Sequence, residues 1–171
     1  MVLPMDVPVT VWGRSDPGLE VSISISDRNS SAVADSEGVW RVRLPALAAS
    51  SEAAVLRVVA GDQAIELVDV LVGEVWLCSG QSNMDFPLSK AVGGREEAAA
   101  AHQFSEIRLL NLTGVLAGNR AFSTAQRERM RPASYFQGTW QVASARAASE
   151  FSAVGWWAGK EIHRKKGVPV G

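Results

Sequence analysis

The hydrophobic period of the sequence changes near residue 69, and this change constrains the fold more than any other feature. From residue 8 to about residue 68, short runs in which apolar and polar residues alternate are separated by turn residues. An alternation with period two is typical of antiparallel strands that bury one face. The clearest runs are residues 21–25 and 40–44. We therefore expect a small, jelly-roll-like β-sandwich over residues 1–68.

Clusters of Asp, Asn, Gly and Pro separate these predicted strands. Proline fixes one turn dihedral, and glycine or asparagine tolerates a positive φ, so the clusters predict hairpin turns. The predicted turns are residues 16–18, 27–29 and 35–38, the further strands are residues 7–12, 55–60 and 64–68, and residues 44–52 are predicted to form a loop.

After Asp69 the pattern becomes one of strands alternating with helices. Residues 74–79 and 107–112 are strand-like, and residues 95–104 predict an Ala-rich helix. This order favours a parallel sheet buried between helices. The sequence supplies about two complete strands of such a sheet, so we expect residues 69–171 to be the first part of an α/β domain that is truncated at its C-terminus.

A longer helix is predicted over residues 149–166. Ser149 is the predicted N-cap, and Gly167 followed by Pro169 is predicted to end the helix. Basic residues in the last turn complement the negative end of the helix dipole. The predicted apolar stripe consists of Phe151, Val154, Gly155, Ala158 and Ile162.

Composition excludes several classes of protein. The 17 Lys+Arg and 18 Asp+Glu residues leave a formal charge of −1, which gives no broad field for a nucleic-acid partner. The longest apolar stretches are shorter than the roughly 20 residues of a membrane helix, so no membrane partner is predicted. The single cysteine allows neither an internal disulfide nor a structural zinc site, and no cofactor is predicted. Residues 1–6 lack a signal-peptide pattern. The cellular compartment is not predicted, because a natural start further upstream could include a signal peptide.

Residues 73–84 are the segment most suited to chemistry. They read Gly-Glu-Val-Trp-Leu-Cys-Ser-Gly-Gln-Ser-Asn-Met, a strand-like run that leads into a sharp turn. Because the carboxyl ends of strands in α/β enzymes face the ligand crevice, Ser82 is well placed for nucleophilic attack. Met84 replaces the second glycine of the Gly-x-Ser-x-Gly elbow, so that turn is not predicted. The residues alone leave open a plain β-turn with a side-chain hydrogen bond from Asn83.

These twelve residues resemble the nucleophile block of the sialate O-acetylesterase family, carbohydrate esterases of the wider SGNH (GDSL-like) hydrolase group. Residues 1–13, 35–45 and 151–171 are also similar to this family. The resemblance implies a β-sandwich followed by a flavodoxin-like SGNH domain. It also implies that the protein removes O-acetyl groups from sugars, chiefly sialic acids, through a serine acyl-enzyme.

The same resemblance assigns roles within the turn. Ser82 is the nucleophile, its backbone N–H is one oxyanion donor, and Gly80, Gln81 and Asn83 shape the turn. The family's remaining donors and its histidine base, which lies in an Asp-x-x-His segment, are expected beyond Gly171. We therefore expect the 171 residues to have little activity by themselves.

Other side chains that suggest chemistry have simpler explanations. His102 and His163 are expected at helix ends, where they complement the dipole. Cys78 is expected to be a small buried hydrophobe. Trp140 lies between predicted elements and is the best candidate for a ring that faces a sugar. Core packing is expected for most of the other tryptophans, which are Trp12, Trp40, Trp76, Trp156 and Trp157.

Two alternative functions remain at this point. One is a noncatalytic carbohydrate-binding β-sandwich that carries a vestigial hydrolase segment. The other is an esterase that acts on acetylated plant polysaccharide, such as xylan. The expected partner is an acetylated sugar substrate. An incomplete sheet would leave Val75, Leu77 and the helix stripe uncovered, so self-association is also expected.

Overall fold

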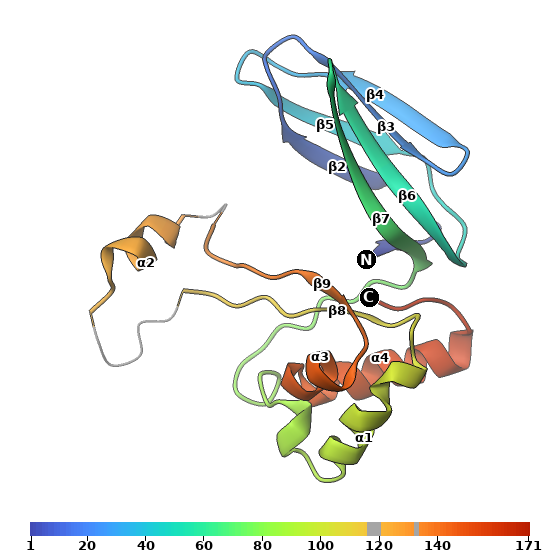
Figure 1. The fold of residues 1–171 in the computed structure, drawn as a ribbon, viewed down its shortest axis with the longest axis vertical. Helices are drawn as coiled ribbons and strands as arrows, with labels where there is room; N and C mark the ends of the chain where they lie inside the picture. Colours follow the sequence, from blue (N-terminus) through green and yellow to red (C-terminus); the bar gives the residue numbers. More distant parts are fainter. Residues whose placement is uncertain (116–120, 132–133) are drawn as a thin grey trace.

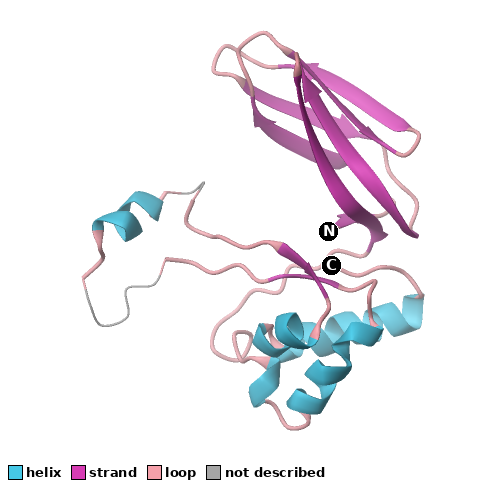
Figure 2. Cartoon of the chain, in the orientation of Figure 1, coloured by secondary structure: helices cyan, strands magenta, loops and turns pink. Residues whose placement is uncertain are grey.

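The chain forms a β-rich upper lobe and a lower lobe that contains most of the helices (Figures 1 and 2). The structure is a computed structural model, and it describes residues 1–115, 121–131 and 134–171. An arm that carries a short helix extends sideways from the lower lobe. The N-terminus and the C-terminus both lie where the two lobes meet.

Two sheets make up the upper lobe. The larger sheet has the strand order β1-β7-β6-β3-β4, and β2 pairs with β5 in the smaller one. Pairing is antiparallel except between β1 and β7, which run parallel. The strand bounds are β1 Val2–Pro4, β2 Val9–Arg14, β3 Glu20–Ile25, β4 Arg28–Val33, β5 Val39–Leu44, β6 Ser50–Ala60 and β7 Gln63–Gly73.

The two sheets enclose one hydrophobic core, and the predicted alternation in β3 and β5 is confirmed. Val21 and Ile23 of β3 are fully buried, as is Leu44 of β5. Fully burying a Val, Leu or Ile side chain contributes about 1.5–3 kcal/mol each, so these three inward positions are strong determinants of the lobe. The serines and arginines between the buried residues are exposed.

The predicted turns exist, but two of the three are not hairpins. Residues 16–18 and 35–38 connect strands of different sheets. The hairpin between β3 and β4 turns at Ser26 and Asp27, one residue earlier than predicted, and pairs Ile25 with Arg28. The predicted loop 44–52 is also shorter, because β6 begins at Ser50. A turn sequence specifies a change of direction but not whether the strands on either side share a sheet.

The lower lobe contains short helices packed around one long helix. Their buried residues form a second core, in which the Trp156 ring is 1% exposed. The elements are η1 Leu88–Lys90, α1 Gly94–Ala100, η2 Ala101–Gln103, β8 Arg108–Leu110, α2 Thr124–Arg129, β9 Trp140–Val142, α3 Ala145–Glu150 and α4 Ala153–Lys166. The predicted helix 95–104 is confirmed as α1 continued by η2.

The prediction of one helix over residues 149–166 is wrong. The chain breaks at Phe151 and Ser152, which separate α3 from α4. Ser149 is not an N-cap, because its hydroxyl donates to the Ala145 carbonyl within α3. Ser152 caps α4 instead, accepting from the Gly155 N–H at 3.2 Å. The predicted C-terminal end is confirmed, since the helix ends at Gly167 with a φ of 65°.

The predicted apolar stripe of this helix is only partly buried. Gly155 is buried and Phe151 and Ile162 are half-buried, whereas Val154 and Ala158 are exposed. Trp156, which the prediction placed beside the stripe, is 1% exposed and faces the core in their place.

The predicted strand 74–79 is wrong beyond its first residues. Glu74 pairs with Val170, and the Trp76 N–H donates to the Gly171 carbonyl at 2.9 Å. Ile107 pairs with Val170 from the other side, also in parallel. Residues 77–80 form no regular structure. Three extended segments therefore run parallel here, and β8 is extended by antiparallel pairing with β9.

Polar contacts join the two lobes. The Arg108 guanidinium is 6% exposed, and its Nη2 donates to both carboxylate oxygens of Asp69 at 2.8 and 3.0 Å. Ser51 in β6 donates to the Glu106 carboxylate at 2.6 Å. Because Arg108 is buried while the Asp69 side chain is 46% exposed, removal of Asp69 would leave a buried guanidinium charge uncompensated.

Gly73 is predicted to be intolerant of a side chain. A Cβ added there would overlap the Pro169 carbonyl oxygen, which accepts the hydrogen bond from the Glu74 N–H. We expect Gly73→Ala to lower the free energy of unfolding by about 1–3 kcal/mol, because neighbouring backbone must shift. The matched control is Gly159→Ala in α4, where the new Cβ would lie 3.6 Å from Val170 Cγ1. That variant should be more stable by about 1 kcal/mol, as helix propensity requires. Urea denaturation of both variants measures the difference, and equal stability of the two would contradict the prediction.

Glu97 is the centre of a partly buried polar network. Its side chain is 18% exposed, and it accepts hydrogen bonds from Trp156 Nε1 at 2.9 Å and from Lys160 Nζ. Burial opposes the charge on Glu97, but the hydrogen bonds from Lys160 and Trp156 outweigh it and lower its pKa below 4.5. The charged carboxylate therefore stabilises the fold.

Stability should depend on pH through Glu97. A lowered pKa means that its contribution is complete above the unfolded value of 4.5 and is lost as the pH falls through the folded value. We expect Glu97→Gln to lower Tm at pH 6, and we expect the difference from the wild type to shrink as the pH is taken below 4.5. Thermal unfolding followed by circular dichroism measures this, with the exposed Glu52→Gln as control. A Tm difference that is constant with pH would refute the role of the charge.

Candidate active site

Ser82 lies in an exposed turn that follows the parallel segment Glu74 to Trp76. The Asp85 N–H donates to the Gln81 carbonyl at 3.0 Å and closes the turn over residues 81–85. Ser82 and Asn83 are both exposed. Among the described residues, neither side chain has a hydrogen-bond partner, so an Asn83 side-chain bond does not hold this turn. The Ser82 hydroxyl is accessible from solvent.

The turn is held against the start of α4. The Ser152 hydroxyl, which caps α4, lies 3.4 Å from Met84 Sδ and donates to it. Before the turn, Cys78 Sγ lies 3.4 Å from the position that a Cβ on Gly155 would take. A glycine is therefore needed at residue 155 if the segment before the turn is to approach the helix this closely.

Pairing of the backbone fixes the other end of the turn. The Leu88 N–H donates to the Phe151 carbonyl at 2.8 Å, and the Ala153 N–H donates to the Phe86 carbonyl at 2.9 Å. Residues 86–88 thus form a short antiparallel pair with the residues that lead into α4. Both sides of the Ser82 turn contact the same helix start, and this limits how far the hydroxyl can move.

Gly80 and Gln81 lie in or next to the turn. A Cβ on Gly80 would lie 3.0 Å from Met84 Cβ, a tight contact that favours glycine. The Gln81 carbonyl accepts the hydrogen bond that closes the turn, while its side chain is exposed. Met84, where the elbow motif has glycine, is half-buried and carries the contact to Ser152. The sequence interpretation missed this role of Met84 and Ser152, because residue 155 is glycine rather than the Glu or Gln of a capping box and so gives no local signal for a cap at Ser152.

Among the described residues, neither histidine forms a hydrogen bond with the Ser82 turn. His163 Nδ1 lies 2.8 Å from the Val168 carbonyl oxygen, and its ring meets the Phe104 ring edge-on at 6.2 Å. It follows Gly155 by eight residues, a distance of roughly 12 Å along the helix axis. His102 is exposed, and its Nδ1 lies 2.9 Å from the Ala99 carbonyl oxygen. Both histidines lie at helix ends, as predicted.

Cys78 is exposed, so its predicted burial is wrong. Leu77 is 87% exposed and Trp76 is 55% exposed, which also contradicts core packing of this tryptophan. The physical reason is that residues 74–76 are paired on one side with residues 169–171, and residues 77–80 leave the sheet. The exposure predicted for Leu77 and for Val75, which is 41% exposed, is confirmed.

Trp140 lies in β9, opposite Leu110 of β8. It is half-buried, and a Cβ on Gly171 would lie 3.0 Å from its Cη2 atom. The indole thus covers the end of the segment that pairs with Trp76, and this contact uses part of the ring that the sequence suggested for a sugar.

No group of three or more His, Cys, Asp or Glu side chains in the described residues is arranged to hold a metal ion. None of the described helices is long and apolar enough to cross a bilayer. Two open hollows lie on the upper lobe, one bordered by residues of β3 and β4 and the other by Thr10, Trp12 and Arg41. Neither hollow includes Ser82.

Comparison with known proteins relates this arrangement to esterases. No family model matches the chain. The chain is 25% identical over 120 residues to human sialate O-acetylesterase, which covers 63% of the chain and 22% of the relative. The mouse sialate O-acetylesterase is 25% identical over 112 residues, 60% of the chain and 21% of the relative. A solved structure of a carbohydrate acetylesterase from Xanthomonas citri superposes with a TM-score of 0.84 and 36% identity, over 99% of this chain and 36% of that one. The chain resembles the sialate O-acetylesterase family.

These similarities confirm the resemblance to esterases of this family. The likeness to the Xanthomonas citri structure extends over both lobes, because it covers 99% of the chain. The chain spans about a fifth of the length of the curated relatives, at 22% and 21%. The structural likeness shows a β-rich fold with a few helices that is shared with a carbohydrate acetylesterase.

Proposed function

We propose that this chain carries the nucleophile of a carbohydrate O-acetylesterase and that Ser82 is that nucleophile. The observation that carries the proposal is the exposed Ser82 hydroxyl on a turn held at both ends against the start of α4. A serine in such a position is accessible to an ester and yet restrained in orientation, as nucleophilic catalysis requires. The proposed substrates are acetylated sugars, sialic acids among them, since the relatives are named as esterases of these classes.

The proposed domain layout is a β-sandwich over residues 1–68 and the first part of a flavodoxin-like SGNH domain over residues 69–171. The two sheets around one core support the first part. The parallel bridges that join Glu74, Val170 and Ile107 support the second. β7 itself continues to Gly73, so the two parts share a strand rather than a flexible linker.

In the proposed reaction the Ser82 Oγ attacks the carbonyl carbon of the acetyl ester. A base removes the hydroxyl proton as the new C–O bond forms, and the carbonyl oxygen takes up the negative charge. The Ser82 N–H is one proposed donor to that oxygen, with Gly80, Gln81 and Asn83 shaping the turn. The C–O bond to the sugar then breaks, the sugar oxygen receives the proton, and water hydrolyses the acetyl-serine to acetate.

The base is proposed to come from outside these 171 residues. His163 lies roughly 12 Å along α4 from Gly155, which the segment before the Ser82 turn approaches. His102 is on η2 and hydrogen-bonds its own helix end. A histidine from a further segment of chain, or from a second molecule, would therefore have to approach the exposed side of the turn.

The test is fluorophosphonate labelling of the native protein in an extract of its source, followed by mass mapping of the labelled peptide and of the intact chain. We expect the label on Ser82 in a protein larger than 18.3 kDa. A label on Ser82 in a protein of 18.3 kDa would keep the nucleophile but refute the external segment as the source of the base. The absence of label on Ser82 would contradict the proposal and favour a noncatalytic carbohydrate-binding module.

The sugar is tested separately with two acetylated substrates. We expect faster acetate release from O-acetylated N-acetylneuraminic acid than from acetylated xylan. The opposite order would assign the protein to plant-polysaccharide deacetylation while retaining Ser82 as the nucleophile.

The exposed apolar residues beside the turn are proposed to cause self-association of the isolated 171-residue chain. Val75, Trp76 and Leu77 form a continuous exposed apolar run. We expect light scattering to show a mass above that of the monomer, and Leu77→Ser to shift it toward the monomer. A wild-type chain that is monomeric at high concentration would contradict this proposal.

A further inference from the structure

The smaller sheet of the upper lobe presents an outward face that the proposed function does not use. In β2 and β5 the residues alternate strictly, and Val9, Val42 and Leu44 point into the core. The pairing places Trp12 opposite Arg41 and Thr10 opposite Arg43. The exposed residues of this outer face are Thr10, Trp12, Arg14, Arg41 and Arg43.

Trp12 is 73% exposed, which contradicts the core position predicted for it. The core side of this sheet is occupied by Trp40, which is 8% exposed. Trp40 lies across Gly13, where any Cβ would overlap its ring. Because Gly13 and Trp12 face opposite sides of the strand, the arrangement that buries Trp40 leaves the Trp12 indole outside. Packing in the described structure therefore does not account for a tryptophan at this position.

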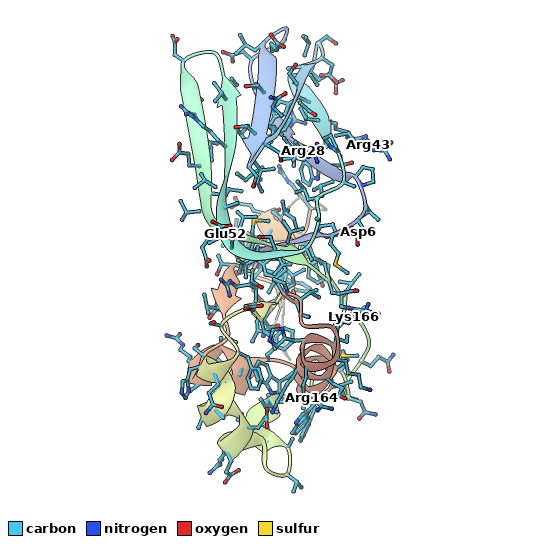
Figure 3. The ribbon with its side chains drawn as sticks, turned by 90° about the vertical axis from the view of Figure 1, so that its right-hand side faces the viewer. Asp6, Arg28, Arg43, Glu52, Arg164 and Lys166 are labelled. Carbon is cyan, nitrogen blue, oxygen red and sulfur yellow. The ribbon has the colours of Figure 1, made fainter. Side chains whose placement is uncertain are left out.

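The charge on this face is positive and uncompensated. Arg14, Arg41 and Arg43 form no ion pair with any residue that the structure describes, whereas Arg28 and Arg57 of the larger sheet each lie beside an acid. The outward positions of β2 and β5 include no Asp or Glu. Figure 3 shows Arg43 extending away from the upper lobe.

The aromatic and cationic groups border the same depression. Thr10, Trp12 and Arg41 line an open hollow of about 400 Å³. Directly opposed residues on neighbouring strands have Cβ atoms about 4.5–5.5 Å apart, so the Trp12 ring and the Arg41 guanidinium can reach one small ligand together.

We propose that this face binds a carboxylated sugar, with the sugar ring against the Trp12 indole and the carboxylate on Arg41 or Arg43. An indole offers a flat apolar surface to the C–H groups of a sugar ring, while Arg presents paired N–H donors that match a carboxylate. Neutral sugars would use Trp12 alone, and small carboxylates would use the arginines alone. The combination selects a ligand that has both features, such as a sialic or a uronic acid.

This site lies on the upper lobe, and its proposed role is to hold an acidic glycan rather than to react with it. Binding should therefore survive Ser82→Ala. The result of a binding experiment at this site therefore neither supports nor contradicts the assignment of Ser82 as the nucleophile.

The experiment titrates the full chain, carrying Ser82→Ala, with N-acetylneuraminic acid, galacturonic acid, galactose and acetate. The readout is the indole N–H signals in nitrogen–proton correlation spectra, with the Trp12 signal assigned by its absence in Trp12→Ala. We expect a saturable shift of the Trp12 signal with an acidic sugar. The dissociation constants for galactose and for acetate should be at least about tenfold larger.

Variants test separately the indole and the arginines of the proposed site. Trp12→Ala should abolish saturable binding measured by calorimetry, and the double variant Arg41→Ala/Arg43→Ala should weaken it at least about tenfold. The controls are Trp157→Ala and Arg28→Ala, which remove an exposed tryptophan and an exposed arginine elsewhere and should change nothing. All these positions are on the surface, and circular dichroism checks that the variants fold.

Each outcome decides the proposal. Binding of either acidic sugar supports it, and the preference between N-acetylneuraminic and galacturonic acid identifies the class. The proposal is overturned if galactose or acetate binds as tightly as the acidic sugars, if Trp12→Ala retains binding, or if no acidic sugar gives a saturable shift.

Discussion

Replacing Ser82 with alanine is expected to lower acetyl-ester hydrolysis at least about 1,000-fold, because removal of a serine nucleophile leaves only binding and oxyanion stabilisation. The same change should leave Tm unaltered, since the Ser82 side chain is exposed and has no hydrogen-bond partner among the described residues. The measurement is acetate release by the protein as its source produces it, with any further chain or partner that supplies the base. Reaction with a fluorophosphonate should be lost in parallel.

The matched control for this variant is Ser79→Ala. Ser79 is an exposed serine three residues before Ser82, in the same segment but before the turn. We expect Ser79→Ala to retain activity and labelling. If Ser82→Ala keeps more than about a tenth of the wild-type rate, the assignment of the nucleophile is wrong, because a lost nucleophile costs orders of magnitude. If the two serine variants lose activity equally, the segment acts through its structure rather than through the Ser82 hydroxyl.

Replacing Trp156 with alanine is expected to lower the free energy of unfolding by about 3–5 kcal/mol, the usual cost of truncating a buried aromatic residue. Trp156 is 1% exposed at the centre of the lower core and meets Phe104 edge-on at 6.2 Å. Its indole N–H also donates to Glu97, so the variant removes one of the hydrogen bonds that keep this carboxylate charged. Urea denaturation followed by circular dichroism measures the loss.

The neighbouring residue provides the control for this prediction. Trp157 has the same side chain on the same helix, but it is 38% exposed. We expect Trp157→Ala to cost about 1 kcal/mol or less, because less apolar surface leaves the core. A similar loss of stability in both variants would show that helix α4 responds to any truncation and that Trp156 has no special position in the core.

Local sequence patterns were sufficient to predict several structural features of this protein. The alternation of Val21 and Ile23 with serines predicted which side of β3 faces the core, because successive side chains of a strand point to opposite faces. The same rule in β2 places Trp12 outside once Val9 and Val11 are inside, a signal that an expectation based on residue type overlooked. Residues 73–84 carried the resemblance to the sialate O-acetylesterase family, and their order, a strand-like run before a turn, suggested Ser82 as the candidate nucleophile.

Only the tertiary structure decided how these local elements combine. A turn at residues 16–18 is local, but whether the next strand joins the same sheet depends on which arrangement buries the most apolar surface. No local sequence signal indicates that residues 86–88 pair with the start of α4, about 65 residues later. None indicates that Ser152 rather than Ser149 caps this helix. These pairings are long-range, and their free energy comes from partners that are distant along the chain. The position of the Ser82 turn against α4, and the exposure of Cys78 and Leu77 beside it, are therefore properties of the folded chain rather than of any segment.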